Sequence, residues 1–334
     1  MAKVQIDTGI SRLLFYAVLR DEDAKNMLNG NGFTPTITDP RTDSYEYENH
    51  SYLDKGVAFE VSKFNDSPWG LYVYVNPPMV LKYSSSYQPS EESYEALAKT
   101  VNKKLHKIRS PRKLEDMKLS SVTVTADFEL SKEGKMDQYL GVIQQAFVPR
   151  HYCAVQLPGE ELLPGKFLPY RQCCMTTTFL AHGSFVSKTA FHVELILLRR
   201  AIRRKVGKKT LNSHYKALLQ LSRQAGKMLA GQLKRMKLQA DSYVSYDKAV
   251  KAIDGVKNED TRKQMKYLLK KTRDLGSLSP AIDKLKKHYG LSKRQANRIV
   301  KQFTKLGISP VTVEDTGKKG LPGLGVLLKN SGKK

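Results

Sequence analysis

The chain has 334 residues, of which 40% are hydrophobic, with 57 lysines and arginines against 32 aspartates and glutamates. This length and hydrophobic content supply cores for roughly two domains and exclude a chain that is disordered as a whole. The charge is unevenly distributed: residues 195–334 contain 35 basic and 9 acidic residues, whereas residues 1–194 contain 22 and 23. A basic block of this kind presents a strong field to a polyanion, so nucleic acid is the first expected partner.

The cysteines and the apolar runs bear on the compartment. Cys153, Cys173 and Cys174 are an odd number without the paired C-x2-C spacing of a structural zinc site, which predicts reduced thiols and a cytoplasmic protein. The first residues lack the charged-then-apolar pattern of a leader, and the apolar run at 195–198 ends at Arg199. We therefore expect no membrane partner.

The first half of the sequence predicts strands separated by polar turns, together with two helices. Runs of β-branched and aromatic residues predict strands at 12–19, 57–61, 71–75, 122–128 and 191–198. Helices are predicted at 91–108 and 134–147, and a loop at 158–169. The fold class expected from this order is α+β, with a largely antiparallel sheet domain followed by a basic all-α domain.

Beyond Arg204 the apolar residues recur at threes and fours, which indicates helices. One stripe along a predicted long helix consists of Leu211, Tyr215, Leu218, Ala225, Met228, Leu229, Leu233 and Met236. Further helices are predicted at 246–253, 260–275, 280–289 and 293–306. We expect an α+β domain at 1–206, a basic helical domain at 207–316 and a flexible basic tail at 317–334.

Residues 280–306 have the layout of a helix-turn-helix. Ile282 and Leu285 supply the inner face of a first helix, and Gly290 permits the left-handed backbone that the turn requires. The second helix then buries a stripe made of Ala296, Ile299, Val300 and Phe303. This is the most specific motif in the sequence.

The turn and the outward face of the second helix complete the motif. Leu291 is expected to fill the corner, and Ser292 is expected to cap the second helix. The positions that face outward are Lys293, Arg294, Asn297, Arg298 and Lys301. These residue types contact phosphates and base edges when such a helix lies in the major groove of duplex DNA. The alternative is an ordinary helical corner with a solvated basic face.

A second basic run at 199–209 joins the last predicted strand to the helical part. It includes Arg203 and Arg204, and acids that would neutralise it are missing nearby. We expect these two arginines to contact phosphates, which would position the protein on DNA without reading its sequence. The alternative is a solvated face.

Polar side chains alternate along two of the predicted strands. Asp127 and Glu129 share a face of one strand with Thr123, and His192 shares a face of the last strand with Glu194. Asp127 and Glu194 are thus the candidate ligands of a divalent cation such as Mg²⁺ or Mn²⁺. The alternative is that these polar residues face solvent. No P-loop pattern occurs, so no nucleotide cofactor is expected.

The order of several segments resembles that of a known family: LSSVTVTADFEL, a helix, FHVELILL, and then basic helices ending in KLGISPVTV and LPGL. It is similar to the trans-acting rolling-circle replication initiators of Gram-positive plasmids and integrative elements. The resemblance implies a strand of the form L-S-R-hydrophobe-D, a Y-x-K segment and an R-aromatic-E strand, whose acids bind metal and whose tyrosine attacks DNA. Here Ser121 and Thr123 replace arginine and aspartate, Val186 stands near the tyrosine position, and Glu194 alone carries over.

These departures leave two alternatives for catalysis. Either the nicking tyrosine lies elsewhere, with Tyr152 and Tyr170 as the candidates, or the chain is a non-catalytic relative. We expect the chain to be a DNA-binding protein of a plasmid or mobile element that recognises a replication origin, with or without strand nicking. If the origin is two-fold symmetric, we expect a homodimer. A non-catalytic DNA-binding regulator and an RNA- or ribosome-associated protein are the alternatives.

Overall fold

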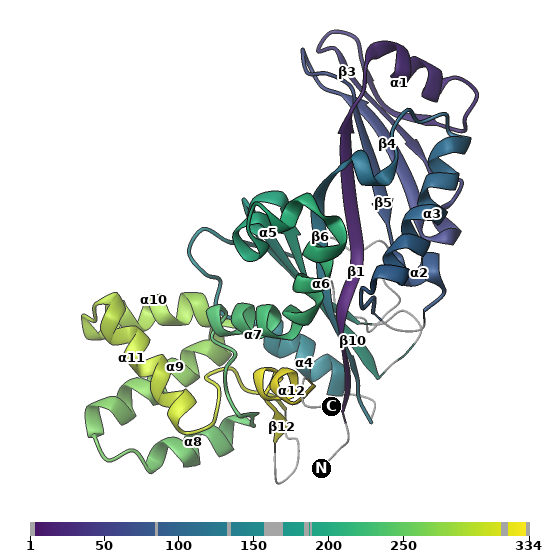
Figure 1. Ribbon diagram of the computed structural model, residues 1–334. Coiled ribbons are helices and arrows are strands. Elements are labelled where there is room, and N and C mark those ends of the chain that lie inside the picture. Colours follow the sequence, from purple (N-terminus) through teal and green to yellow (C-terminus); the bar gives the residue numbers. More distant parts are fainter. Residues whose placement is uncertain are drawn as a thin grey trace. The chain divides into compact units, whose positions relative to one another are not determined.

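The structure, a computed structural model, describes residues 4–83, 86–131, 135–156, 170–183, 187, 189–314 and 320–331 (Figure 1). The chain divides into two compact units, each built from separate stretches of sequence. Unit 1 contains Met1–Asp7, Ala126–Leu195 and Gly226–Lys334, and unit 2 contains Thr8–Thr125 and Ile196–Ala225. The division therefore does not follow a single cut after residue 206, and the domain boundary drawn from the sequence stays a prediction.

The fold class is α+β, as the sequence predicts, because both units combine helices with antiparallel strand pairs. Three long strands contribute residues to both units: β1 (Gln5–Val18), β6 (Lys118–Glu129) and β10 (Ala190–Leu198). The predicted strands at 12–19, 122–128 and 191–198 lie within these three elements, to within one residue. None of the described helices is long and apolar enough to span a membrane.

In unit 1 the strands β7 (Cys153–Gln156), β8 (Tyr170–Cys174) and β9 (Thr177–Gly183) pair antiparallel, and β9 lies next to β10. Helix α4 (Lys135–Gln144) packs on this sheet, because the Tyr139 ring stacks on Phe191 at 5.4 Å. Phe191 in turn stacks on Phe128 of β6 at 4.5 Å. The loop predicted at 158–169 lies outside the described residues.

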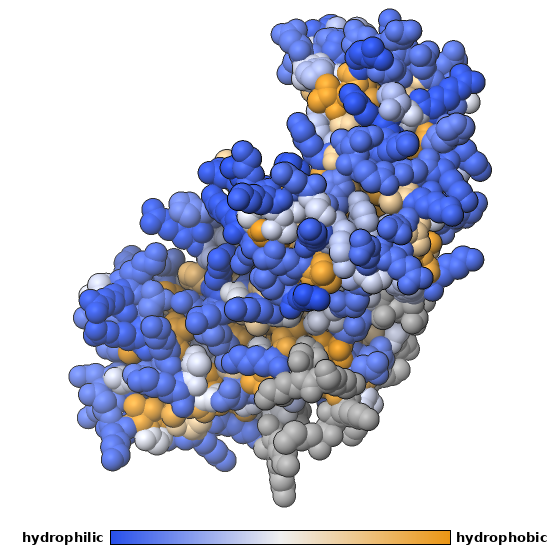
Figure 2. Space-filling model, in the orientation of Figure 1, coloured by the Kyte–Doolittle hydropathy of each residue, from blue (hydrophilic) through white to orange (hydrophobic). Residues whose placement is uncertain are grey.

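The C-terminal helices of unit 1 begin with α7 (Ala225–Arg235), which is the second part of the predicted long helix. The four helices that follow lie close to the predicted segments: α8 (Tyr246–Asp254), α9 (Glu259–Leu275), α10 (Leu278–Tyr289) and α11 (Lys293–Lys305). Two backbone hydrogen bonds join them to the segment after α4: Leu278 N donates to Gln145 O at 2.8 Å, and Phe147 N donates to Met236 O at 3.1 Å. Figure 2 shows hydrophilic residues over much of the visible surface of α9–α11, with apolar residues between them.

The end of the chain differs from the predicted flexible tail over the residues that the structure describes. Strand β12 (Leu321–Pro322) pairs antiparallel with β11 (Ser242–Tyr243), and helix α12 (Leu324–Ser331) follows it. Leu321, Leu324 and Leu328 are buried. The Tyr139 hydroxyl donates to Pro322 O at 2.9 Å, so this segment is anchored to α4.

In unit 2 the strands β2 (Thr34–Asp39), β3 (Ser44–Asn49), β4 (Val57–Lys63) and β5 (Gly70–Val75) form an antiparallel sheet with β1, in the order β2-β3-β4-β5-β1. The strands predicted at 57–61 and 71–75 are confirmed as β4 and β5. Residues on one face, including Phe15, Phe59 and Val73, are fully buried. The other helices of this unit that precede β6 are α1 (Asp21–Leu28), α2 (Pro77–Leu81) and α3 (Glu91–Lys107), and α3 confirms the helix predicted at 91–108.

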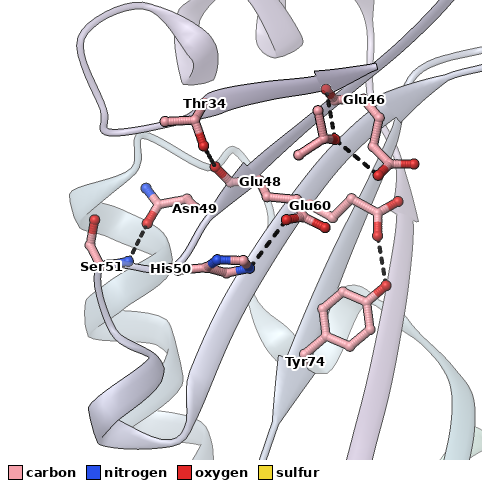
Figure 3. Close-up of polar contacts among 9 residues, drawn as sticks. Thr34, Glu46, Glu48, Asn49, His50, Ser51, Glu60 and Tyr74 are labelled. Atoms are coloured by element: carbon pink, nitrogen blue, oxygen red, sulfur yellow. Dashed lines mark hydrogen bonds and ion pairs between the residues drawn. The ribbon is translucent and has the colours of Figure 1, made fainter. Parts of the chain in front are cut away.

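The opposite face of this sheet is polar and aromatic (Figure 3). The Tyr74 hydroxyl donates to Glu60 Oε2 at 2.6 Å, and Thr34 Oγ1 donates to the backbone oxygen of Glu48 at 3.2 Å. Such a face is typical of an antiparallel sheet that is covered on one side only. Gly70 has a specific role there: a Cβ atom at this position would lie 2.8 Å from the Tyr16 ring, so glycine leaves room for the rings around it.

Helices α5 (Arg199–Val206) and α6 (His214–Arg223) complete unit 2. The sequence predicts one long helix over the stripe from Leu211 to Met236, but the structure divides it at Gln224 into α6 and α7. His214 fixes the start of α6, because its Nδ1 lies 3.1 Å from the Tyr94 hydroxyl and its ring lies 5.2 Å from that of Phe15.

This half-buried histidine predicts acid sensitivity of unit 2. Burial lowers the pKa of His214 below its usual 6.5. The contribution of the neutral ring to stability is therefore present above the pKa of the unfolded chain and is lost as the pH falls below it. We expect the melting temperature to fall between about pH 7.5 and about pH 5.5, and to fall less in a His214→Gln variant, which accepts the same hydrogen bond without titrating. Equal pH dependence in both proteins would contradict this assignment.

Candidate nucleic-acid interface

The turn between α10 and α11 has the local structure that its sequence predicts. Gly290 adopts φ +62°, in the left-handed region, and ends α10. Ser292 caps α11 reciprocally with Gln295: Gln295 N donates to Ser292 Oγ at 3.3 Å, and Ser292 N donates to Gln295 Oε1 at 2.8 Å. These local bonds set the residue at which α11 begins.

The predicted inner faces of both helices are buried. Ile282 and Leu285 of α10 are buried. The α11 stripe, also buried, consists of Ala296, Ile299, Val300 and Phe303. Leu291 differs from its predicted role because its side chain is only half-buried, although its N–H donates to Lys286 O at 3.0 Å and so closes the turn. Packing of these apolar residues determines which side of α11 faces outward.

The outward side of α11 carries unneutralised cations. Lys293, Arg294, Arg298 and Lys301 are exposed and Asn297 is half-buried. The first turn of α11 contains no acid, and none of these four cations forms an ion pair within the described part of the chain. Cations in the first turn oppose the helix dipole by about 0.3–1 kcal/mol each, so stability alone does not favour them there.

Three lysines of the neighbouring helix α9 form ion pairs with acids. In α9, Lys263 lies 2.8 Å from Glu259, and Lys271 lies 3.4 Å from Asp274. Lys266 likewise pairs with an acid of α8 at 2.5 Å. These three lysines of α9 therefore lie beside acids, whereas the exposed cations of α11 do not.

Lys237, which the sequence does not single out, extends this charged face. It follows α7 with φ +63°, at the position of a helix end where glycine is the default residue. The N–H of Leu238 donates to Leu233 O at 2.9 Å, which is the bond expected for that end. The Lys237 Nζ lies 5.7 Å from the centre of the Phe147 ring.

The pKa of Lys237 is lowered by burial and then by the charges of Lys301 and Lys293. These three lysines are therefore close enough to repel one another. We call Lys237, Lys293, Arg294, Arg298 and Lys301 the α11 basic patch. An anion bound to this patch would relieve the repulsion among these lysines.

The second predicted basic run forms α5. Arg203 and Arg204 are exposed in its last turn, where cations complement the helix dipole. Arg199 has a structural role instead, because its Nη1 donates to Leu119 O at 2.8 Å. Helix α5 belongs to unit 2, whereas the α11 basic patch belongs to unit 1. Phosphate contact by Arg203 and Arg204 stays a prediction.

The polar residues predicted on β6 and β10 do come together in unit 1. His192 Nδ1 lies 2.8 Å from Asp127 Oδ1, and this hydrogen bond raises the pKa of the imidazole. His182 of β9 joins them: its ring lies 5.2 Å from that of His192, and its Nε2 lies 4.0 Å from Glu194 Oε2. Glu194 is only 5% exposed, so it does not face solvent.

The expected Mg²⁺ or Mn²⁺ site stays a prediction. Such cations prefer a set of converging oxygen ligands, but Asp127 and Glu194 each lie against a histidine ring. Over the residues that the structure describes, no group of three or more His, Cys, Asp or Glu side chains is arranged to hold a metal ion. We therefore derive no catalytic step through a metal.

Of the two tyrosine candidates, only Tyr152 has a side chain within the described part of the chain. The side chain of Tyr170 and the residues Val186 and Lys188 lie outside the described part of the chain. Tyr152 contacts Thr177 Oγ1 at 2.7 Å, and burial raises the pKa of its phenol. The Tyr74–Glu60 pair, which the sequence does not reveal, has a phenol whose pKa is raised first by burial and then by the carboxylate. A raised pKa disfavours the phenolate needed for attack on phosphorus.

No protein-family model matches the sequence, and the curated proteins compared with it contain no match. Two features of the described residues thus bear on function. One is the α11 basic patch, and the other is the group of Asp127, His192, His182 and Glu194, of which Glu194 is buried.

Proposed function

We propose that the chain is a double-stranded DNA-binding protein that places α11 in the major groove. The observation that carries this proposal is the set of exposed cations on one side of α11, none of which forms an ion pair within the described part of the chain. A major groove admits an α-helix, and arginine and asparagine match the exposed edges of guanine and adenine. Arg298 and Asn297 are the residues suited to reading bases, and the lysines are suited to phosphates.

The resemblance to rolling-circle replication initiators supports a role at a replication origin of a plasmid or mobile element, in the cytoplasm. A two-fold symmetric origin would call for a homodimer. A regulator without catalytic activity would use the same interface. Strand nicking is not part of the proposal, because Asp127 and Glu194 face histidines rather than a shared metal position.

The proposal is tested by selection of bound sequences from a random duplex pool with the intact chain. We expect a preferred sequence to be enriched, and an Arg298→Ala variant to lose about 1–3 kcal/mol of binding to that sequence and to relax the preference at its contact position. Lys284→Ala is the matched control, because Lys284 is an exposed cation on α10 outside the α11 basic patch. It should leave both affinity and preference unchanged.

Structured RNA at the same salt concentration serves as the competitor in this experiment. Duplex DNA is expected to be retained in preference to RNA, since an A-form major groove is too narrow for a helix to enter. Tighter binding of RNA, or a duplex pool in which no sequence is enriched, would refute DNA recognition by α11. A Glu194→Gln variant should bind the enriched duplex as the unchanged protein does.

A further inference from the structure

Unit 2 has a further basic surface besides α5, and it lies in residues 1–194, the part of the sequence without an excess of basic residues. A pocket of about 730 Å³ opens beside the C-terminal half of α3 and the loop that follows it. Its lining includes Lys99, Lys103, His106, Lys107, Arg112 and Lys113. We call this group the α3 pocket. It lies within the part of the chain whose basic and acidic residues otherwise balance.

The basic excess of this pocket is local, so it is not visible in the count of charged residues over 1–194. Residues 99–118 contain eight lysines and arginines but only two acids, Glu115 and Asp116. Glu115, the carboxylate in the lining, accepts two hydrogen bonds from the Asn102 amide at 2.9 and 3.2 Å. This bond holds the carboxylate on Asn102 and leaves the surrounding lysines without an acidic partner of their own.

The lysines of the α3 pocket are exposed and available. Lys99, Lys103, Lys107 and Lys113 are exposed, and the structure shows no ion pair for any of them over its described residues. The pKa of the buried Lys104 beside them is lowered, first by burial, then by the charge of Lys55, and also by the charge of Lys107. Cations near the end of α3 also complement the helix dipole, but Arg112 and Lys113 lie in the loop beyond the helix.

The chemistry of the lining selects the kind of occupant. Lysines, an arginine and a histidine offer donors and positive charge to phosphate oxygens. The lining contains no tyrosine, tryptophan or phenylalanine on which a base could stack, and no glycine-rich loop that would cradle a nucleotide. The occupant that fits is therefore a sugar-phosphate backbone contacted without regard to sequence.

We propose that the α3 pocket is a further DNA contact, on unit 2 and separate from α5, which binds backbone phosphates independently of base sequence. This proposal rests on the proposed function of the chain as a DNA-binding protein. It assigns a binding role to the half of the chain whose sequence carries no net positive charge. Lys103 and Lys107 are the central residues, because they are exposed on α3 itself and line the pocket.

The test compares two double variants of the intact chain, Lys103→Gln/Lys107→Gln and the control Lys25→Gln/Lys82→Gln. All four lysines are exposed in unit 2, and the control pair lies outside the pocket. Binding to the selected duplex and to an unrelated duplex is measured from about 50 to 200 mM salt. In the pocket variant, the negative slope of log K against log salt should become shallower by about 1.8. Binding to both duplexes should weaken about tenfold or more at about 0.1 M salt. The ratio of the two affinities should not change.

The control variant should keep the wild-type slope, and thermal melting should show that both variants are folded. An unchanged slope in the pocket variant, or equal losses in the two variants, overturns the proposal. A pocket variant whose slope is unchanged, but which no longer binds inorganic pyrophosphate bound by the wild type, would also overturn it in favour of a small-anion site. Failure of α11 to select a sequence would leave these slopes intact, so the two proposals fail separately.

Discussion

Replacing Lys293, Arg298 and Lys301 together by glutamine is expected to lower the affinity of the intact chain for duplex DNA by about two to three orders of magnitude at about 0.1 M salt. Each cation that neutralises a phosphate releases counterions, so the negative slope of log K against log salt should become shallower by about 2.7 when three are removed. Glutamine is a good helix former, and the buried stripe of α11 is untouched. Fluorescence anisotropy with a labelled duplex measures both quantities.

The matched control for this variant is Lys263→Gln/Lys266→Gln/Lys271→Gln on α9. It removes the same formal charge, but from lysines that already pair with acids. We expect it to change affinity much less, because each removed cation leaves an unpaired acid rather than an unoccupied phosphate contact. Equal losses in the two triple variants would mean that net charge alone drives binding and that α11 has no special place.

Replacing Lys237 by glycine is expected to change stability and binding in opposite directions. Glycine adopts φ +63° without the steric cost of about 1 kcal/mol or more that lysine bears there. The variant also removes a half-buried cation repelled by Lys301 and Lys293. Its melting temperature should therefore rise. Loss of one phosphate contact should weaken duplex binding several-fold and make the negative slope of log K against log salt shallower by about 0.9.

Two further variants separate strain from charge at this position. Lys237→Asn tolerates the left-handed backbone and lacks the charge, so it should behave as glycine does. Lys237→Arg keeps the charge and the strain, so it should bind nearly as the wild type does. If Lys237→Gly is more stable but binds DNA as tightly as before, Lys237 is not part of the interface.

The α10–α11 pair could be predicted from the sequence because every local signal agrees there. Helical spacing of apolar residues, a glycine at the turn and a serine cap all specify the same boundaries, and the structure has each of them. The outward residues of α11 follow directly from the buried stripe. Leu291 is the exception, since one half-exposed corner residue has no periodic pattern to reveal it.

Other features depend on contacts between distant segments and could not be read locally. Strands β2 and β3 are polar on most positions, so they carry no apolar alternation. The burial of Glu194 and its approach to His182 depend on how β9 and β10 lie together. Lys237 acquires its role only because α7 ends beside α11. The charge of the α3 pocket disappears when counts are averaged over half of the chain.

The most direct test of the central claim is equilibrium binding of the intact protein to a duplex over about 50 to 200 mM salt. The α11 basic patch and its unpaired cations predict tight binding at the low end, with a steep, linear fall of log K as log salt rises. No retention of any duplex at about 50 mM salt, or an affinity that does not depend on salt, would contradict the account.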